Sequence, residues 1–523
     1  MSLSPALLRK LDDALVGRRV SEGFALLERA SEGVTHLTPK DPRAVSYLLS
    51  IAQWVDLGYR DLHLVEGLLK RFSAVRRADM KLADYLQLRM TEAFFAFASE
   101  DAATAISILE SVLVVQPEAS KPHFILMAHF WKARAHRQKG EYELALRHIL
   151  EAKSLAEQLC APKLIAVIRI HESWLLFQRG QRKEAFRLLD EAEAELKPIG
   201  HALSLGNIES ARGRFVRRSG EYAKALEHFH RAIAIYSKQF PNHPNLARVL
   251  VNAAYVKRLI ALDLSHRSKE GRARGIQHDR YLTICREALE LLQRAREIYA
   301  LHGHQAGTGS VLVNAGHLHL DSGDIDRASE EAVKAFHLGK EKQDHILMSR
   351  ARTLQAAIEN MQVEEQVGEA EDIASHANTA TQYSEEAIAL AKQTQNKRLL
   401  AGAYIARGST AANDFFEEWE VAKQFVSLAS DLLSPDDRDH LSKELLVLKS
   451  RILRAIGIDQ TLRSWSDGLT GDKTFQQVTE EFAEIVIPKV WMREGRKISK
   501  VAAKLSISPK KVRRILRNAQ LLH

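Results

Sequence analysis

The chain has 523 residues, of which 46% are hydrophobic and 27% charged, and its formal net charge is +9. This length exceeds what one compact core usually holds, and the composition excludes a disordered or collagen-like chain. No apolar run approaches the ~18 residues of a membrane-spanning helix, and the charged first residues lack the apolar core of a signal peptide. The two cysteines, Cys160 and Cys285, lie far apart in helical patterns. We therefore expect buried thiols and a cytoplasmic location.

A pattern of small and aromatic residues recurs about every 40 residues from residue 5 to residue 435. Its clearest copy contains Gly213, Gly220, Tyr222, Ala225, Phe229 and Ala232. Ala, Leu, Glu, Lys and Arg dominate the chain, and strand-like alternation is scarce, so each copy is expected to be helical. The expected centres of the copies are residues 25, 65, 105, 145, 185, 225, 288, 328, 380 and 422.

The spacing of small residues predicts helical hairpins. Two helices pack closely where small residues face each other, and a glycine between them permits a tight turn. One hairpin cannot bury its own apolar face, so the hairpins must stack. The pattern resembles the tetratricopeptide repeat (TPR) family, in a variant longer than the usual 34 residues. The resemblance implies an all-α fold: a right-handed superhelix of about ten stacked hairpins, a TPR-like solenoid with a groove for a peptide or protein.

Two breaks in the repeat predict insertions near residues 259–281 and 361–375. The first contains a basic stretch, residues 265–280, which we expect to be a mobile loop. Its interpretation stays open between a tolerated surface insertion and a loop that touches nucleic acid or covers the groove. Beyond the repeats, residues 436–457 predict a helix that caps the array. Residues 458–472 contain glycines and few apolar residues, and are predicted to be a linker.

The excess positive charge of the chain lies at its C-terminus. Residues 489–523 carry a net charge of +10, and the other 488 residues carry −1. Residues 473–523 are predicted to form a small helical domain. Its first helix begins near Thr474 and is expected to kink or restart at Pro488, and its second covers residues 498–505. A basic third helix follows, with Ser508 as N-cap and Pro509 in the first helical position.

The last two helices have the spacing of a helix-turn-helix. Ala502 supplies the small residue where the helices would cross, and the surrounding apolar positions are Val501, Leu505, Ile507, Val512 and Ile515. The segment A-A-K-L-S-I-S, residues 502–508, resembles the helix-turn-helix family and especially its Fis-type domains, although Ser506 replaces the usual glycine. The resemblance implies that duplex DNA is bound by Lys497, Lys500, Lys504, Ser508, Lys510, Lys511, Arg513, Arg514 and Arg517. The alternatives are RNA binding and a solvated basic helix that only aids solubility.

Candidate ligand-binding residues also lie in the repeats. Two copies contain V-L-V-N-A, with the asparagines at Asn252 and Asn314. In related peptide-binding arrays an asparagine at this place holds the backbone of the ligand, and a carboxamide can both donate and accept. The alternative is that these side chains satisfy neighbouring backbone groups. Arg134, Arg214 and Arg217 would add positive charge to the same groove.

No catalytic motif is present, so we expect no enzyme activity and no cofactor. The H-x-H pairs, such as His228 and His230, point to different helix faces, so we expect no metal site. The main hypothesis is a bacterial-type transcription regulator whose array senses a peptide or protein and whose terminal domain binds DNA. We expect a homodimer, because a single such domain seldom holds a DNA site alone. The alternative is an interaction scaffold whose basic tail binds an acidic partner.

Overall fold

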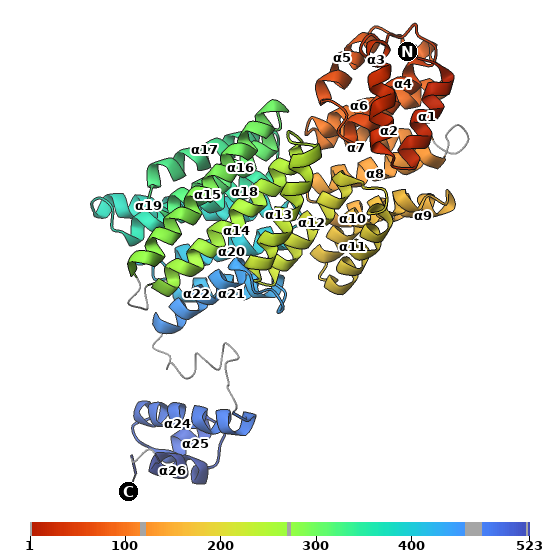
Figure 1. Ribbon diagram of the computed structural model, residues 1–523. Coiled ribbons are helices and arrows are strands. Elements are labelled where there is room, and N and C mark those ends of the chain that lie inside the picture. The colour runs from red at the N-terminus through yellow and green to blue at the C-terminus, as the bar shows by residue number, and fades with distance from the viewer. Residues whose placement is uncertain (1–2, 116–121, 269–273, 456–472, 519–520, 523) are drawn as a thin grey trace.

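The computed structural model describes residues 3–115, 122–268, 274–455, 473–518 and 521–522. Within these ranges the chain forms twenty-five α-helices and one short 3-10 helix, and no strand (Figure 1). None of the helices in these ranges is long and apolar enough to cross a membrane. The predicted all-α class is confirmed.

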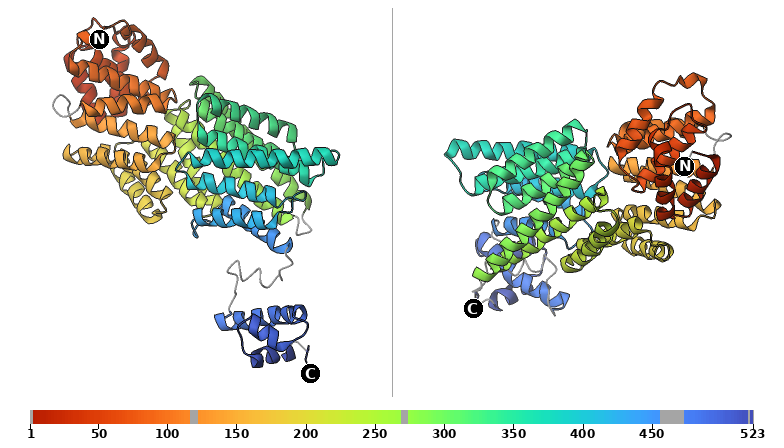
Figure 2. Two further views of the ribbon diagram at one scale, coloured as in Figure 1. Left: turned by 180° about the vertical axis from the view of Figure 1, so that it is seen from behind. Right: turned by 45° about the horizontal axis from the view of Figure 1, so that its top comes forward.

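Up to residue 432, the described residues form ten successive helix pairs, and the two helices of each pair contact each other. The pairs are α1 (Pro5–Val16) and α2 (Val20–Arg29), α4 (Ala44–Asp56) and α5 (Leu62–Phe72), α6 (Leu82–Ala98) and α7 (Ala102–Val114), α8 (Pro122–Gln138) and α9 (Tyr142–Gln158), α10 (Pro162–Gln178) and α11 (Arg182–Leu196), α12 (Ala202–Arg218) and α13 (Tyr222–Gln239), α14 (Pro244–Ser268) and α15 (Arg274–Leu301), α16 (Gln305–Asp321) and α17 (Ile325–Glu341), α18 (His345–Glu364) and α19 (Ala370–Lys392), and α20 (Lys397–Ala411) and α21 (Trp419–Leu432). Short helices α3 (Ser31–Thr35) and η1 (Arg77–Asp79) lie in connections. The chain is thus a TPR-like solenoid (Figure 2).

The expected repeat centres lie at the helix-to-helix contacts in nine of the ten pairs. Their exposed fraction is 0% at Val65, Ala105, Ala145, Ala185, Ala225, Ala288, Ala328, Ala380 and Ala422. The tenth centre is wrong, because Ala25 is exposed and Gly23 is buried instead. A Cβ atom at Gly23 would lie 2.0 Å from the Trp54 ring, so the closest approach between α2 and α4 falls two residues earlier than the repeat predicts.

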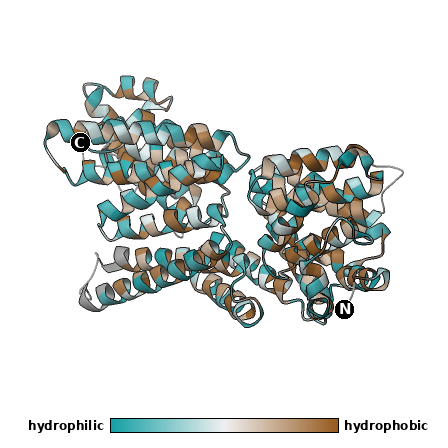
Figure 3. Cartoon of the chain, turned by 90° about the horizontal axis from the view of Figure 1, so that it is seen from above, coloured by the Kyte–Doolittle hydropathy of each residue, from teal (hydrophilic) through white to brown (hydrophobic). Residues whose placement is uncertain are grey.

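Glycine is required at two places in the pair α12–α13. Gly220, in the turn between α12 and α13, has φ +79°, a left-handed conformation that costs other residues free energy. Gly213 lies inside α12, where a Cβ atom would come within 2.7 Å of the Phe229 ring. Together these positions allow the two helices to turn sharply and pack closely. Apolar and polar stretches alternate along the helices, as expected for elements with one buried face (Figure 3).

The first predicted insertion extends two helices instead of forming a loop. Residues 265–268 complete α14, and residues 274–280 begin α15. Both segments lack proline, so nothing in them stops a helix that is already packed against a partner. The rest of the expected loop, residues 269–273, lies outside the described residues. The second insertion falls at residues 365–369, in the turn between the long helices α18 and α19.

Turns that are distant in sequence meet, so the array touches itself. The Glu100 carboxylate accepts hydrogen bonds from the backbone N–H groups of Gln305 (2.8 Å) and Ala306 (2.9 Å), at the start of α16. The Gln395 N–H donates to the Gly140 carbonyl at 3.0 Å. These contacts join helix pairs that are not neighbours along the chain.

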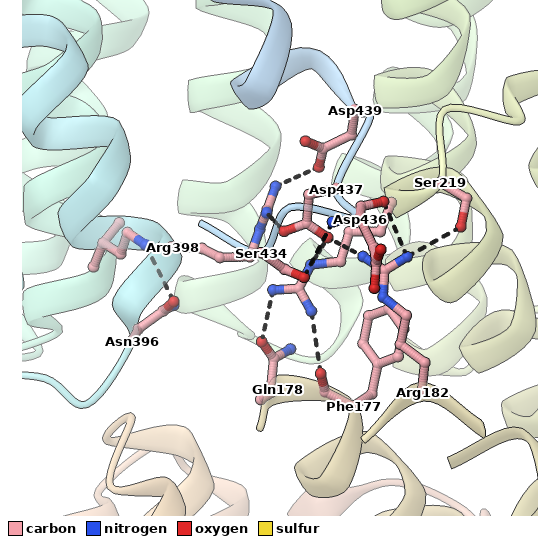
Figure 4. Close-up of polar contacts among 12 residues, drawn as sticks. Phe177, Gln178, Arg182, Ser219, Asn396, Arg398, Ser434, Asp436, Asp437 and Asp439 are labelled. Carbon is pink, nitrogen blue, oxygen red and sulfur yellow. Dashed lines mark hydrogen bonds and ion pairs between the residues drawn. The ribbon is translucent and has the colours of Figure 1, made fainter. Parts of the chain in front are cut away.

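A third such contact involves the loop that follows α21. The Arg438 N–H donates to the Arg218 carbonyl at 3.1 Å. In the same loop Asp437 forms ion pairs with Arg182 of α11 and Arg398 of α20 (Figure 4). The loop therefore connects the middle of the array to its last helix pair. Helix α22 (His440–Ala455) follows and packs on α20 and α21, where a capping helix was predicted.

Three further helices, α24 (Phe475–Arg493), α25 (Ile498–Lys504) and α26 (Pro509–Asn518), form the C-terminal unit. Helix α24 continues through Pro488, so of the two predicted alternatives, a kink or a restart, the restart is wrong. Proline removes only one helical hydrogen bond, and the buried side chains of Ile487 and Trp491 on either side hold α24 in place. The predicted linker, residues 458–472, lies outside the described residues.

The two cysteines differ in exposure. Cys160 lies in a turn with φ +48° and is exposed, so its predicted burial is wrong. A residue at the left-handed position that ends α9 points away from the helix contacts. Cys285 is partly buried, and burial raises the pKa of its thiol.

Candidate functional site

The C-terminal unit has one small core. Helix α26 contributes Val512, Ile515 and Leu516, α25 contributes Val501 and Ala502, and α24 contributes Ile487 and Trp491. Leu505 and Ile507 pack beside them and are partly buried. The six positions on which the turn pattern rests therefore all belong to this core. The core fixes which face of α26 is turned away from it.

The turn between α25 and α26 needs a left-handed residue. Ser506 has φ +52°, which explains why the related pattern favours glycine at this place. The Ile507 N–H closes the turn by donating to the Ala502 carbonyl at 3.1 Å. The Ser508 hydroxyl accepts from the Lys511 N–H at 3.2 Å, so the predicted N-cap is confirmed. These contacts set the direction in which α26 leaves the turn.

The basic residues of α26 divide into two groups. Lys510, Arg513 and Arg517 are exposed and spaced i, i+3, i+7, so they share the face opposite the core. Arg514 is different, because its guanidinium donates to Glu480 of α24 at 2.9 Å. Lys511 is partly buried beside it. The free face of α26 thus presents three of the five predicted side chains.

Three lysines, two in α25 and one just before it, extend the basic surface of α26. Lys497, Lys500 and Lys504 are exposed. Lys504 donates to Glu494 at 2.5 Å, and this hydrogen bond lowers the pKa of Glu494. Within the described residues neither Lys497 nor Lys500 has a carboxylate within 4.0 Å. The arrangement can neutralise phosphates on both sides of α26.

In the array, the first helices of consecutive pairs present an inner face, which we define by Arg134 and Arg137 of α8, Trp174 of α10, Arg214 and Arg217 of α12, Arg248, Asn252 and Tyr255 of α14, and Ser310 and Asn314 of α16. Side chains from neighbouring helices meet on it. Arg248 donates to Asn207 of α12 at 2.9 Å, and Arg350 of α18 donates to Ser310 at 3.3 Å. Of the predicted residues of the array, Arg217 contacts Asn252, and Arg214 lies close enough to Arg217 for their charges to interact.

Arg134 is neutralised by a carboxylate. Its guanidinium donates to Asp56 at 2.6 Å, and the Trp131 ring N–H donates to the same carboxylate at 3.1 Å. Burial acts to raise the pKa of Asp56, but Arg134 outweighs burial and lowers it. Arg134 also lies 4.7 Å from the centre of the Phe97 ring. This arginine is fully engaged within the array.

The two asparagines use their donor groups within their own helices. The Asn252 amide donates to the Arg248 carbonyl and the Asn314 amide to the Ser310 carbonyl, each at 2.7 Å. Asn314 is only 4% exposed. The Asn252 side-chain oxygen accepts from Arg217 at 3.4 Å. In this structure both carboxamides satisfy neighbouring groups, which is the alternative that the sequence left open.

Arg214 and Arg217 lie among charged and aromatic residues that sequence reasoning missed. Burial, together with the charges of Arg248, Arg137 and Arg217, lowers the pKa of Arg214 well below its usual range. Arg217 stacks over Tyr255, with 4.8 Å from its guanidinium carbon to the ring centre. Trp174 is one of the residues that were missed. The repeat could have revealed it, because Arg134, Trp174 and Arg214 are spaced 40 residues apart.

Within the ranges that the structure describes, no group of three His, Cys, Asp or Glu side chains is placed to hold a metal ion. His317, from one of the H-x-H pairs, is partly buried. Burial and the nearby charges of Arg258 and Arg350 lower the pKa of its imidazole well below the usual value.

Comparison with known proteins supports the solenoid fold. A profile described as tetratricopeptide repeat matches residues 204–262, which cover most of α12, all of α13 and most of α14. No curated protein matches the chain in sequence. Among solved structures, a Rap protein complexed with competence and sporulation factor is similar over 74% of this chain and 98% of that chain, at 14% identity and a TM-score of 0.51. Such low identity shows the fold alone.

Two further solved structures align more loosely. The quorum sensor NprR from B. thuringiensis, in its apo form, is 15% identical over 82% of this chain and 98% of its own, with a TM-score of 0.39. A human IFIT1 dimer with PPP-AAAA is 15% identical over 82% of this chain and 94% of its own, with a TM-score of 0.44. Neither adds to the argument at these scores.

Proposed function

We propose that the chain is a DNA-binding transcription regulator of bacterial type that acts in the cytoplasm. Its C-terminal unit, residues 473–523, binds duplex DNA as a Fis-type helix-turn-helix. The TPR-like array before it senses a peptide or protein partner, and no catalysis is involved.

The free basic face of α26 carries this proposal. Lys510, Arg513 and Arg517 are exposed, and within the described residues none of them has a carboxylate within 4.0 Å. An α-helix fits the ~12 Å width of the major groove. Arginine can pair with both acceptors of guanine, whereas lysine mainly neutralises phosphate. We assign base reading to Arg513 and Arg517, and phosphate contacts to Lys510, Lys497 and Lys500.

The fold of the array supports the sensing role. A solenoid presents an extended inner face, and the Rap protein of similar fold was solved in complex with competence and sporulation factor. One terminal unit offers few base contacts, so two copies on two half-sites, a homodimer, would hold DNA more firmly. Ligand binding to the array would then act on the spacing of the two units.

The test is selection of DNA sequences by the full chain. We expect a random duplex pool to yield an enriched sequence. On that sequence Arg513→Ala and Arg517→Ala should weaken binding by ~1–3 kcal/mol, with little effect on unrelated DNA. Arg514→Ala is the matched control, because Glu480 already engages that side chain on the same helix. Fluorescence anisotropy at two salt concentrations measures each affinity.

The second candidate is an interaction scaffold whose basic tail binds an acidic protein. The net charge of +10 carried by residues 489–523 is equally consistent with this second candidate. If Arg513→Ala and Arg517→Ala weaken binding equally on every DNA sequence, and no sequence is enriched, this second candidate is favoured. Neither arginine would then read bases. If neither arginine variant changes DNA binding, α26 does not face DNA.

A further inference from the structure

Arginine and aromatic side chains alternate across the inner face of α8, α10, α12 and α14. The guanidinium carbons of Arg137 and Arg214 lie 5.5 and 5.9 Å from the centre of the Trp174 ring, and that of Arg217 lies 4.8 Å from the centre of the Tyr255 ring. We call these five residues the arginine–aromatic ladder. It joins four helix pairs that are consecutive along the chain.

The arginines of this region lack carboxylate partners. Within the described part of the chain, no carboxylate lies within 4.0 Å of Arg137, Arg214 or Arg248. By contrast, Arg134 pairs with Asp56, and Arg258 pairs with Asp321. The positive charge on the ladder is therefore not neutralised by the array.

Hydrogen-bond donors in the region are also unused. The Nε atoms of Arg214 and Arg248 are buried and have no hydrogen-bond partner. Buried polar groups without partners are uncommon in folded proteins, and each calls for an explanation such as a bound water or ion. Both atoms belong to the group of side chains that meet between α12 and α14.

The like charges are close enough to disfavour one another. Burial and the charges of Arg248 and Arg134 lower the pKa of Arg137 to about 9. Burial and the charges of Arg137, Arg134, Arg248 and Arg214 lower the pKa of His171 well below its usual value. The charge of Asp344 acts on neighbouring Tyr142, but this carboxylate already caps α18 by accepting from the Leu347 N–H. An anion bound on the ladder would relieve this repulsion.

We propose that the arginine–aromatic ladder binds the acidic side chains of an extended peptide. This inference rests on the proposed sensing role of the array and specifies its ligand. A guanidinium that stacks on a ring through its face keeps its N–H groups free at the edge. Those groups match the two oxygens of a carboxylate and form charge-assisted hydrogen bonds with it.

A peptide fits the ladder better than a nucleic acid. Proteins that bind single strands stack bases on exposed aromatic faces. The Trp174 ring is already contacted by Arg137, by Arg214 and by the perpendicular ring of Tyr142, whose centre lies 5.0 Å away. Little of that ring remains for a base, whereas within the described residues Arg137 and Arg214 have no carboxylate partner of their own.

The extent of the ladder sets the length of the ligand. Three steps between four neighbouring helices, at ~10 Å each, cover about 30 Å. An extended chain rises ~3.3 Å per residue, so a peptide of about nine residues would span the ladder. Acidic residues at two or three of its positions would meet the arginines.

The test is selection from a random ten-residue peptide library by the full-length protein. Peptides chosen by the unmodified chain should carry Asp or Glu at fixed positions. A synthetic peptide of that sequence should bind about ten- to a hundredfold more weakly to Arg137→Gln and Arg214→Gln, because each loses a charge-assisted contact. Arg214→Lys should recover part of the loss, since it restores charge without the planar fork.

The matched control is Arg187→Gln on α11, an exposed arginine that pairs with Glu184 and Glu191 away from the inner face. It should bind the peptide unchanged. Thermal unfolding of each variant verifies that it is folded. The interaction should weaken as salt rises.

Four outcomes separate the inference from the proposed function. Acidic peptides whose binding depends on Arg137 and Arg214 support the inference. Selected peptides without fixed acidic positions, or equal binding to both variants, overturn it while leaving peptide sensing intact. Selection of no peptide overturns sensing by the array as well. Retention of a random 20-nucleotide single-stranded RNA that depends on Arg214, without any selected peptide, would identify nucleic acid as the occupant and refute the peptide assignment.

Discussion

Asp437 is the residue on which the contact between the middle and the end of the array depends. Its carboxylate, 3% exposed, accepts from Arg182 of α11 and from Arg398 of α20, the latter at 2.5 Å, and the Arg218 Nε lies 3.7 Å away (Figure 4). Burial and the charge of Arg398 lower the pKa of Arg218 to about 9, and Asp437 acts in the opposite direction. Asp437→Asn keeps the size of the side chain but removes the charge that holds three guanidinium groups together.

The expected loss of stability depends on which partners the arginines keep in Asp437→Asn. Removing one partner of a buried ion pair costs ~3–5 kcal/mol, because the remaining charge is left without compensation. Here Arg398 keeps its second partner, Asp439, and the side chain of Arg182 is 20% exposed. We therefore expect a smaller loss, about 2–4 kcal/mol. In a solenoid this loss is local and falls on the helix pairs that the loop connects.

Hydrogen exchange of backbone amides in the full chain measures the loss. The amides of residues 434–445 should exchange about 30- to 1000-fold faster in Asp437→Asn, the equivalent of that free energy. Asp436→Asn is the matched control, because its side chain is exposed and only its carbonyl accepts from Arg182. Equal exchange in the two variants would refute the assignment of this contact to the Asp437 charge.

Two further predictions concern pH and packing. Burial and the charges of Lys132, His129 and His136 lower the pKa of His148 to about 3, so the folded chain keeps it neutral while the unfolded chain binds a proton below pH 6.5. His148 should therefore contribute a fall in stability of under ~1 kcal/mol per pH unit as pH drops from 6.5 toward 3, because solvent screens the partly exposed imidazole. His148→Gln should have a shallower slope of melting temperature against pH than the unmodified chain, and parallel slopes would contradict this. Gly213→Ala should destabilise the array by ~1–3 kcal/mol in urea, because its Cβ atom would lie 2.7 Å from Phe229. Gly67→Ala, where nothing lies within 4 Å of the added Cβ atom, should be neutral or stabilising, and a similar loss in both would count against the packing argument.

The repeat could be predicted from sequence because the packing of two helices leaves a local signature. Small residues fit best at the point of closest approach, so Ala145, Ala185 and Ala225 recur at a fixed interval and are all fully buried. The same reasoning failed at Ala25, where Gly23 under the Trp54 ring takes that role. Nothing local distinguishes the two residues, because the choice depends on how α4 packs against α2.

The helices and the turn of the C-terminal unit could also be predicted from sequence, because they too depend on residues close together in the chain. Its turn and core involve residues within about 30 positions of one another, so the spacing of Val501, Ala502 and Val512 carries the arrangement. Which cations remain free was not predictable. Arg513 and Arg514 are neighbours in sequence, yet only Arg514 meets Glu480, a residue of α24. That pairing is set by the angle between two helices.

The sequence by itself therefore determined the helix pairs, their stacking, and the concentration of positive charge at one end, because each depends on residues close together in the chain. Tertiary structure decided how distant turns meet at Glu100 and Asp437, and which arginines face one another without carboxylates. The curvature of the array sets those meetings, and it accumulates from small rotations between successive pairs. No single stretch of sequence encodes that sum, so the contacts of Trp174 with Arg137 and Arg214 became visible only in three dimensions.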